Sequence, residues 1–536
     1  MNAAQLFVSC LEWHAIEYIF WVPWEENLDL LEAIRTSSIK LIVTRNEQTA
    51  VFMAATYGRL TWKAWVALST LWPGATNMIT GIAHAQLGWM PVLVITGQKP
   101  IKKSKQAKFQ IIDQVALMKP ITKFTTSIVD PSRVPNLVAY ALQIAEEEKP
   151  GAVHIELPED IAREDASWIL PITKEKLRRP IPDLKAIQRI IDKLKHASTP
   201  LILVWAWANR KRVTTYLWAF IKQYNIPFFC SQMWKGVLDE RMDQYIGTAA
   251  LTSNDYIHTA IQKADCIIAV GYDIIEKPVH LFSTENHELI HINFFAAEYD
   301  TLYQPSLQVV WDIGNIFWQL SQQQIQIDHW HFEALYDAAQ HAKEQHTKTL
   351  KAHNKHEQMM PWRLISEIRS VLDDDDIVAL DNGLYKVWFA RNYPTYSPNT
   401  LLLDNALATM WAWYAIATSA KLLNPDKHVI AVVGDWWIVM NLWDLETVVR
   451  LRLNITIIIL NDNAYGMIKW KQNDQHMPSY WLDLANPDFV VLAKSFWAYG
   501  HFVDSPDMFT PTLQKALQED GLSIIELPFI YPESFE

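Results

Sequence analysis

Short apolar runs alternate with amphipathic stretches through the first third of the chain. The apolar runs predict strands over residues 18–22, 39–44, 64–69 and 91–96. Apolar residues recur at helical spacing over residues 5–13, 27–34, 48–58 and 75–86. Strands that alternate with helices are typical of a parallel sheet with helices on both faces. The first third is therefore predicted to be an α/β domain.

The same alternation returns twice more along the chain. It predicts a first domain over residues 1–165, a middle domain over 184–320 and a third domain over 361–532, with a polar linker over 159–182 and a charged helical connector over 321–358. Middle-domain strands are predicted at 201–204, 266–270 and 289–292, and third-domain strands at 377–380, 428–433, 455–460 and 523–527. The first and third domains share a layout, which suggests duplication. The predicted fold class is α/β, with three doubly wound parallel-sheet domains.

Bulk properties exclude several classes of protein. The chain has 536 residues, too many for one core, and a net charge of -12, which argues against nucleic acid as the main partner. No apolar run approaches the roughly 18 residues of a membrane span, and the first residues lack the pattern of a signal peptide. Three widely spaced cysteines, Cys10, Cys230 and Cys266, form no CxxC pair. We therefore expect a cytoplasmic protein without a disulfide framework.

Acidic and amide side chains follow two of the predicted strands of the third domain. Gly434-Asp435 comes directly after the run that ends at Val433, and Asn461-Asp462 follows the run 455–460. Mg²⁺ prefers oxygen ligands and often keeps diphosphate oxygens in its shell. Parallel α/β sheets bind ligands outside the carboxyl ends of their strands. The two strand ends resemble the cofactor motif of thiamine-diphosphate enzymes, and this resemblance implies a joint site for Mg²⁺ and a diphosphate.

Four further segments accompany this motif: 45–48 (Arg-Asn-Glu-Gln), 69–77 (Ser-Thr-Leu-Trp-Pro-Gly-Ala-Thr-Asn), 404–410 (Asp-Asn-Ala-Leu-Ala-Thr-Met) and 465–472 (Tyr-Gly-Met-Ile-Lys-Trp-Lys-Gln). With them the chain resembles the acetolactate synthases, a group of thiamine-diphosphate enzymes, over nearly its whole length. The resemblance implies pyrimidine-binding, middle and diphosphate-binding domains. It also implies thiamine diphosphate and Mg²⁺ as cofactors.

The resemblance assigns individual residues to the cofactor. A glutamate at a helix start is usually only a capping group, but Glu47 matches the family glutamate that bonds N1′ of the aminopyrimidine. Met410 matches the residue that wedges under the cofactor, and the carbonyl of Ala408 is expected to receive its 4′-amino group. The loop of Gly383, Leu384 and Tyr385 is expected to hold the diphosphate.

The metal and substrate positions follow from the same resemblance. Asp435, Asp462 and the carbonyl of Ala464 are expected to bind Mg²⁺. The adjoining members of the expected cofactor site are Gly434, Trp436, Trp437, Tyr465, Gly466 and Met467. Phe109, Gln110 and Lys123 match positions near the substrate in this family.

The implied reaction starts from pyruvate. One pyruvate is decarboxylated on thiamine diphosphate, and the hydroxyethyl unit is joined to a second 2-oxo acid with release of CO₂. The family active site lies between two subunits, which implies a homodimer or homotetramer. A small regulatory subunit, FAD in the middle domain, and a role in branched-chain amino acid biosynthesis or acetoin formation stay open. Another 2-oxo-acid decarboxylase or oxidase of the same cofactor class is the alternative.

Tryptophan stands at many positions where the family has glycine. The chain has 25 tryptophans and only 15 glycines, against roughly 38 glycines expected at the ordinary share of about 7%. One example is Gly434-Asp435-Trp436, where relatives have Gly-Asp-Gly. The sixteen positions are Trp21, Trp24, Trp62, Trp65, Trp72, Trp89, Trp205, Trp207, Trp234, Trp311, Trp411, Trp413, Trp436, Trp437, Trp481 and Trp497.

Ordinary substitution does not explain this pattern. Overpacking one core site costs about 1–3 kcal/mol, so sixteen such changes would exceed a typical stability of about 5–15 kcal/mol. The codons GGA and UGA differ by one base, and genetic codes differ in whether they read UGA as glycine or tryptophan. Our hypothesis is that the sixteen tryptophans are UGA codons that the natural protein reads as glycine. If the real residues are tryptophans, a non-catalytic relative is the expected alternative.

Overall fold

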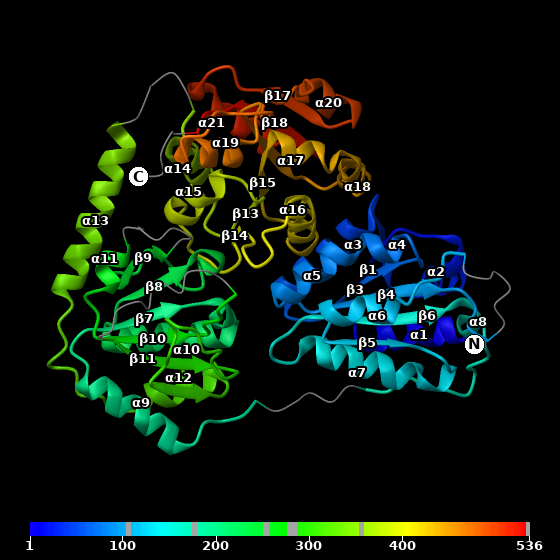
Figure 1. The fold of residues 1–536 in the computed structure, drawn as a ribbon, viewed down its shortest axis with the longest axis horizontal. Coiled ribbons are helices and arrows are strands. Elements are labelled where there is room, and N and C mark those ends of the chain that lie inside the picture. The colour runs from blue at the N-terminus through cyan, green and yellow to red at the C-terminus, as the bar shows by residue number, and fades with distance from the viewer. Residues whose placement is uncertain (103–108, 174–178, 250–256, 276–286, 353–358, 532–536) are drawn as a thin grey trace.

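The computed structural model describes residues 1–102, 109–173, 179–249, 257–275, 287–352 and 359–531. These residues form three lobes, each built around a six-stranded sheet (Figure 1). Every pairing between neighbouring strands is parallel, and helices cover both faces of each sheet. The predicted fold class is confirmed.

The first sheet has β3 (Trp65–Ser69) and β4 (Val92–Gln98) at its centre, and every residue of both strands is buried. Strands covered on both faces read as continuous apolar runs, which is why the sequence pattern located them. The main covering helices are α1 (Ala3–Trp13), α2 (Leu28–Arg35), α3 (Glu47–Thr61), α5 (Ile79–Leu87) and α7 (Val134–Glu146). The strand order is β2 (Lys40–Val43), β1 (Tyr18–Trp21), β3 (Trp65–Ser69), β4 (Val92–Gln98), β6 (Ala152–Pro158) and β5 (Phe124–Ser127).

The third sheet repeats the topology of the first strand for strand. Its order is β14 (Leu401–Leu402), β13 (Ile377–Leu380), β15 (Val429–Gly434), β16 (Thr456–Asn461), β18 (Ser523–Pro528) and β17 (Tyr499–Phe502). In both sheets the second strand along the chain is one edge and the fifth is the other. The shared layout that the sequence suggested is therefore present in the structure. The helices include α15 (Tyr385–Asn392), α16 (Ala412–Leu423), α17 (Asp435–Val439), α19 (Gly466–Asp474) and α20 (Phe489–Ser495).

The middle sheet has a different topology. Its order is β12 (Leu307–Val310), β11 (Glu288–Asn293), β10 (Cys266–Val270), β7 (Pro200–Val204), β8 (Phe228–Ser231) and β9 (Tyr245–Ala249). Counted along this domain, the order reads 6-5-4-1-2-3, the doubly wound arrangement of dinucleotide-binding folds. The topological switch point lies between β7 and β10, which pair directly.

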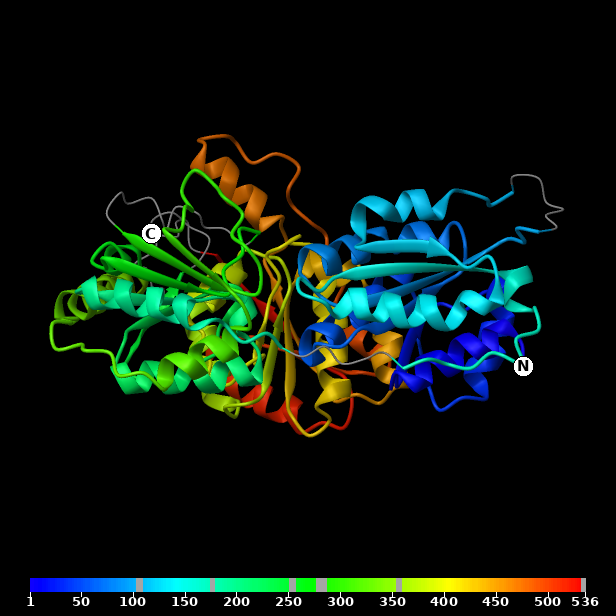
Figure 2. The same cartoon turned by 90° about the horizontal axis from the view of Figure 1, so that it is seen from below.

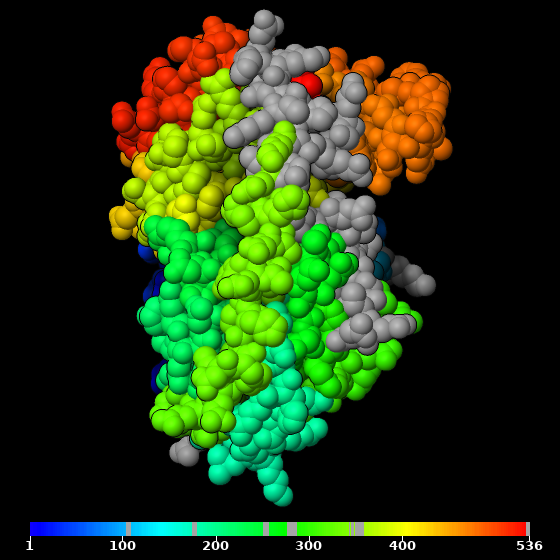
Figure 3. Space-filling model, turned by 90° about the vertical axis from the view of Figure 1, so that its left-hand side faces the viewer, coloured from blue at the N-terminus to red at the C-terminus, as the bar shows by residue number. Residues whose placement is uncertain are grey.

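Two connections join the three lobes. The described residues 163–173 of the predicted polar linker run without a helix or named strand along the base of the first lobe (Figures 1 and 2). It begins later than expected, because residues 159–162 form the short helix α8 (Glu159–Ala162). The charged connector forms α13 (Glu333–Ala352), which runs along the outside from the middle lobe toward the third (Figures 1 and 3).

Left-handed backbone occurs at five of the sixteen unusual tryptophans and at none of the other nine. A positive φ occurs at Trp62, Trp89, Trp411, Trp481 and Trp497, with values between 53° and 78°. All five belong to the sixteen positions, and none of the remaining tryptophans, all of them in the described residues, has a positive φ. This region is uncommon for residues with a Cβ and natural for glycine. The backbone at these five positions thus supports the glycine hypothesis.

Trp497→Gly is expected to stabilise the protein by about 1 kcal/mol, because glycine relieves the left-handed strain that tryptophan incurs. Trp497 has a φ of 59° and follows the end of α20, where its N–H donates to the carbonyl of Lys494. Its side chain is 81% exposed, so little packing is lost. The measurement is the melting temperature by calorimetry. Trp168→Gly is the control, since Trp168 is 73% exposed with ordinary φ. Equal effects of both changes would contradict the argument.

Acidification is expected to destabilise the first domain through His154. This fully buried ring lies between the hydroxyls of Thr96 and Thr125, each 2.8 Å from one ring nitrogen, and burial lowers its pKa to about 3. A histidine with a lowered folded-state pKa contributes stability above its unfolded pKa of about 6.5, and loses about 1.4 kcal/mol per pH unit below that value. The stability gap between the wild type and His154→Gln should therefore shrink as the pH falls from 7 to 4. If the free energies of unfolding of the two proteins keep the same difference from pH 7 to pH 4, this expectation is contradicted.

Candidate functional site

A cavity of about 400 Å³ opens at the carboxyl edge of the third sheet. Its walls come from the ends of β13, β15 and β16 and from the segment before α16. Every residue predicted for the cofactor site except Glu47 lies on these walls. They are Gly383, Leu384, Tyr385, Ala408, Met410, Gly434, Asp435, Trp436, Trp437, Asp462, Ala464, Tyr465, Gly466 and Met467.

Two carboxylates face this cavity from neighbouring strands. Asp435 follows β15 and Asp462 follows β16, and the two strands pair in register up to Gly434 and Leu460. Burial raises the pKa of Asp435; burial, followed by the charge of Asp435, raises the pKa of Asp462 to about 7. A divalent cation would relieve this repulsion, because both groups are oxygen ligands of the kind that Mg²⁺ prefers. The donor set therefore fits Mg²⁺.

Asn486 completes the surroundings of Asp435, and sequence reasoning missed it. Its amide nitrogen lies 2.6 Å from Oδ2 of Asp435 and 3.1 Å from the side-chain oxygens of Asn461 and Asn463. The same Oδ2 accepts the N–H of Asn463 at 2.8 Å. Asn486 lies 51 residues after Asp435 in a segment without regular structure, so no local pattern marked it.

The turn after Asp435 carries the two adjacent tryptophans. The indole of Trp436 packs against Tyr465, with ring centroids 4.7 Å apart. A Cβ on Gly434 would lie 3.1 Å from Cδ1 of Trp437, so that indole covers the glycine closely. Backbone N–H groups must approach a diphosphate closely, which favours glycine. The cavity therefore fits a diphosphate only when glycine replaces Trp436 and Trp437.

Glu47 lies apart from this cavity. It is the first residue of α3, after the carboxyl end of β2, and Oε2 accepts a hydrogen bond from Asn77 at 3.0 Å. Asp444 of the third domain holds the same turn, since it accepts the N–H of Arg45 at 2.9 Å and the hydroxyl of Thr49 at 2.6 Å. Glu47 is not among the described residues that line the cavity of its own chain.

The three predicted substrate residues fall in two places. Phe109 is 65% exposed and Gln110 has a φ of 54°; both follow β4 at the carboxyl edge of the first sheet. Lys123 precedes β5 and lies at the opposite, amino edge. Its ammonium donates to the carbonyls of Ile144 and Glu147 at the end of α7. This helix-capping position accounts for Lys123, and the structure does not support a substrate role for it.

With tryptophan at positions 205 and 207, the middle sheet does not fit FAD. In doubly wound sheets a dinucleotide lies in the crevice at the switch point. Here the crevice at the ends of β7 and β10 is filled by Trp205 and Trp207, which are 0% and 1% exposed. A Cβ on Gly271 would lie only 2.8 Å from the Cβ of Trp207, so Trp207 packs closely against Gly271 in this crevice.

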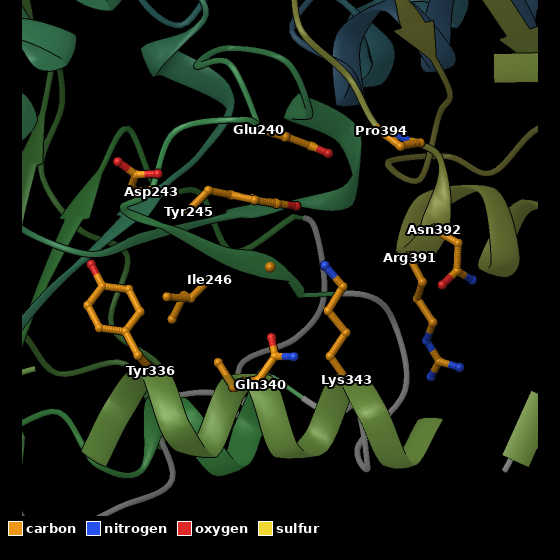
Figure 4. Close-up of a pocket in the computed structure, with 12 residues that line it drawn as sticks. Glu240, Asp243, Tyr245, Ile246, Tyr336, Gln340, Lys343, Arg391, Asn392 and Pro394 are labelled. Atoms are coloured by element: carbon orange, nitrogen blue, oxygen red, sulfur yellow. The ribbon is translucent and has the colours of Figure 1, made fainter. Parts of the chain in front are cut away.

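A second cavity, of about 410 Å³, lies between the middle and third domains (Figure 4). Lys343 and Gln340 reach into it from α13, and Arg391 and Asn392 face it from α15. Glu240 on its wall is paired with buried Lys235 at 2.7 Å and accepts the hydroxyl of Thr395. Glu240 therefore joins two domains and serves as a structural group.

Comparisons with known proteins agree across the chain. Residues 1–117 match the N-terminal TPP-binding domain of thiamine pyrophosphate enzymes, residues 187–320 the central domain and residues 381–527 the C-terminal TPP-binding domain. Thiamine pyrophosphate is another name for thiamine diphosphate. None of the helices among the described residues is long and apolar enough to cross a membrane.

Similar proteins carry one recurring name. The chain is 29% identical to "Acetolactate synthase" of Bacillus subtilis (strain 168), over 99% of this chain and 94% of the relative. It is 28% identical to "Acetolactate synthase, catabolic" of Raoultella terrigena, over 99% and 96%. It is 25% identical to "Acetolactate synthase isozyme 2 large subunit" of Escherichia coli (strain K12), over 99% and 97%.

Proposed function

Because this chain belongs to the thiamine-diphosphate enzymes, we propose that it acts as an acetolactate synthase. The observation that carries the proposal is the single cavity that gathers the Asp435–Asp462 pair with the rest of the predicted cofactor residues. The names of the full-length relatives support pyruvate and a second 2-oxo acid as substrates. Product analysis must separate this reaction from that of another 2-oxo-acid decarboxylase or oxidase.

The residues of this chain would hold the cofactor and guide protons. Asp435, Asp462 and the carbonyl of Ala464 would bind Mg²⁺, and Gly383 with its neighbours would hold the diphosphate. The carbonyl of Ala408 and the side chain of Met410 would orient the aminopyrimidine. Thiamine diphosphate supplies a nucleophilic carbon and an electron sink for decarboxylation. Glu47 would hold a proton at N1′ and so set the protonation state of the pyrimidine.

We also propose that the working unit contains at least two chains. Glu47 does not line the cavity of its own chain, so a second copy would supply it. Exposed apolar side chains around the cavity support burial against another copy. They are Met467, Ile468, Met477 and Tyr480, which are 40–72% exposed. Helix α19 has no buried residue and stands out from the body of the protein (Figure 2).

The natural protein, in this proposal, carries glycine at the sixteen tryptophan positions. We call the chain with all sixteen replaced by glycine the glycine-restored chain. Four of the tryptophans, Trp21, Trp89, Trp207 and Trp413, also bury an indole N–H without a hydrogen-bond partner, which is unfavourable. The codons decide the matter: UGA at these positions is expected, and UGG would contradict the hypothesis.

Incubation of the glycine-restored chain with pyruvate, thiamine diphosphate and Mg²⁺ tests the reaction. We expect acetolactate and CO₂ as the main products. Acetaldehyde or acetate as the main product would instead support a decarboxylase or oxidase. Binding of the cofactor without any turnover would favour a non-catalytic relative. In the same assay, addition of a second 2-oxo acid would establish which acceptor is preferred.

A cytoplasmic location and a partnership with a small regulatory subunit are further parts of the proposal. Relatives that are named as large subunits support the partnership.

A further inference from the structure

The segment 403–411 joins β14 to α16 through irregular backbone. It carries Ala408 and Met410, which line the cavity. Ala408 has a φ of 51° and Trp411 a φ of 78°, so the chain turns twice through the left-handed region. Such strain persists only where neighbouring groups fix the backbone. The groups that fix this segment therefore decide where the Ala408 carbonyl lies.

Asp404 fixes the segment from within. Its carboxylate is buried; Oδ1 accepts the N–H of Ala406 at 3.1 Å and Oδ2 accepts the N–H of Ala408 at 3.0 Å. These two hydrogen bonds fold residues 404–408 around one side chain. Asp404 is not among the described residues that line the cavity, so it acts on the site only through the backbone that it holds.

His84 of the first domain holds Asp404 in turn. Nδ1 of His84 lies 3.3 Å from Oδ2 of Asp404, and each side chain is 1% exposed. The ring of His84 packs edge-on against Phe52, with centroids 5.0 Å apart, so it has a fixed place on α5. Burial alone would raise the pKa of Asp404, but His84 and Lys386 outweigh it and bring the pKa to about 2. The carboxylate is therefore ionised.

Two cationic side chains hold the start of the segment. Arg59 of α3 donates to the carbonyl of Leu403 at 2.9 Å and to that of Met233 in the middle domain at 3.1 Å. Lys386 of α15 donates to the carbonyl of Asp404 at 3.0 Å. The first domain thus reaches the segment twice, through Arg59 and His84. The loop that carries part of the cavity wall is held from outside its own domain.

We propose that Asp404, held by His84, is a positioning residue that aims the Ala408 carbonyl and the Met410 side chain at the aminopyrimidine of thiamine diphosphate. The proposal rests on the proposed cofactor site. It adds that contacts between the first and third domains of one chain set the geometry of that site. His84 and Asp404 are 320 positions apart and share no motif.

Hydrogen exchange on the full chain without cofactor tests whether Asp404 holds the backbone of residues 404–408. Asp404→Ala is expected to speed exchange at the amides of Ala406 and Ala408 at least about tenfold, because each loses its acceptor. Asp376→Ala is the matched control. Asp376 is buried and accepts two backbone N–H groups, those of Asp373 and His428 at 2.8 Å, at the opposite end of β13. Unchanged exchange at residues 406 and 408 in Asp404→Ala would overturn the proposal.

Cofactor binding tests the positioning. In the glycine-restored chain, Asp404→Asn and His84→Phe are expected to raise the Kd for thiamine diphosphate with Mg²⁺ at least about tenfold by calorimetry, or about 1.4 kcal/mol. The KM for pyruvate at saturating cofactor should stay the same, and Asp376→Asn should leave the Kd unchanged. Equal Kd changes in Asp404→Asn and Asp376→Asn would show a merely structural role and overturn the proposal. If the unmutated glycine-restored chain binds cofactor but makes no acetolactate, the proposed function fails while this comparison still stands.

Discussion

Glycine at positions 436 and 437 is expected to allow the chain to bind thiamine diphosphate with Mg²⁺, whereas the chain with both tryptophans is expected to show no binding. Both indoles lie on the wall of the cavity that contains Asp435 and Asp462. Trp437 covers Gly434 closely, and Trp436 is fixed against Tyr465. Removal of the indoles frees space and lets backbone N–H groups reach the diphosphate.

Isothermal calorimetry of the double variant Trp436→Gly, Trp437→Gly measures this effect. We expect a gain in affinity of at least about 100-fold, which corresponds to about 2.7 kcal/mol. The double variant Trp168→Gly, Trp218→Gly is the control, because these side chains are 73% and 48% exposed and lie outside the cavity. Tight binding by the chain with both tryptophans would contradict the expectation. It would mean that the diphosphate does not use this turn.

Glu47→Gln is expected to lower kcat of the glycine-restored chain by about 10²–10⁴-fold, the usual contribution of a positioned proton-transfer group. Glutamine keeps the size of the side chain but carries no carboxyl group to hold the proton at N1′. Glu47 lies at the start of α3, away from the metal pair of its own chain. The cofactor affinity should therefore fall much less than kcat. An unchanged kcat would exclude Glu47 from the reaction.

Mixing inactive chains extends this test to the subunit arrangement. Asp435→Asn removes a metal ligand from the cavity, and Glu47→Gln removes the proton-holding group. If each site takes Glu47 from one chain and Asp435 from the other, a random mixture of the two variants regains about a quarter of the activity, because half of the dimers have one intact site. If both residues act within one chain, the mixture gains nothing. Dissociation and reassociation of the purified variants, followed by an assay with pyruvate, separates the two outcomes.

The position of Lys123 shows how a motif match can mislead. Its neighbours in the family pattern, Phe109 and Gln110, follow a strand at the carboxyl edge of the first sheet. Lys123 precedes a strand instead, and so lies at the other edge, with its ammonium bound to helix carbonyls. Direction along a parallel sheet decides which edge a residue reaches. A residue type at a matching position in the sequence carries no such information.

The sequence by itself determined the three α/β domains and most walls of the cavity. Both are local properties: a strand buried on two faces is apolar throughout, and the residues that end it are contiguous with it. The glycine and tryptophan counts likewise revealed an anomaly, and the family resemblance located its sixteen positions before any backbone angle was known. Seven of the strands in the described residues were not predicted, and five of them, β5, β9, β12, β14 and β17, are sheet edges. Edge strands are covered on fewer sides, so their sequences need not be apolar.

Only the tertiary structure decided the contacts between distant parts of the chain. Asn486 reaches Asp435 across 51 residues, and Asp444 holds the turn before Glu47 across 399. His84 meets Asp404 because a helix of the first domain packs against a loop of the third. The first pair joins distant parts of one domain, and the other two form where the first and third domains pack together. No local sequence pattern connects the two partners of any of these pairs. The sequence therefore predicts which chemical groups the site contains, while tertiary contacts within and between domains decide how those groups are held.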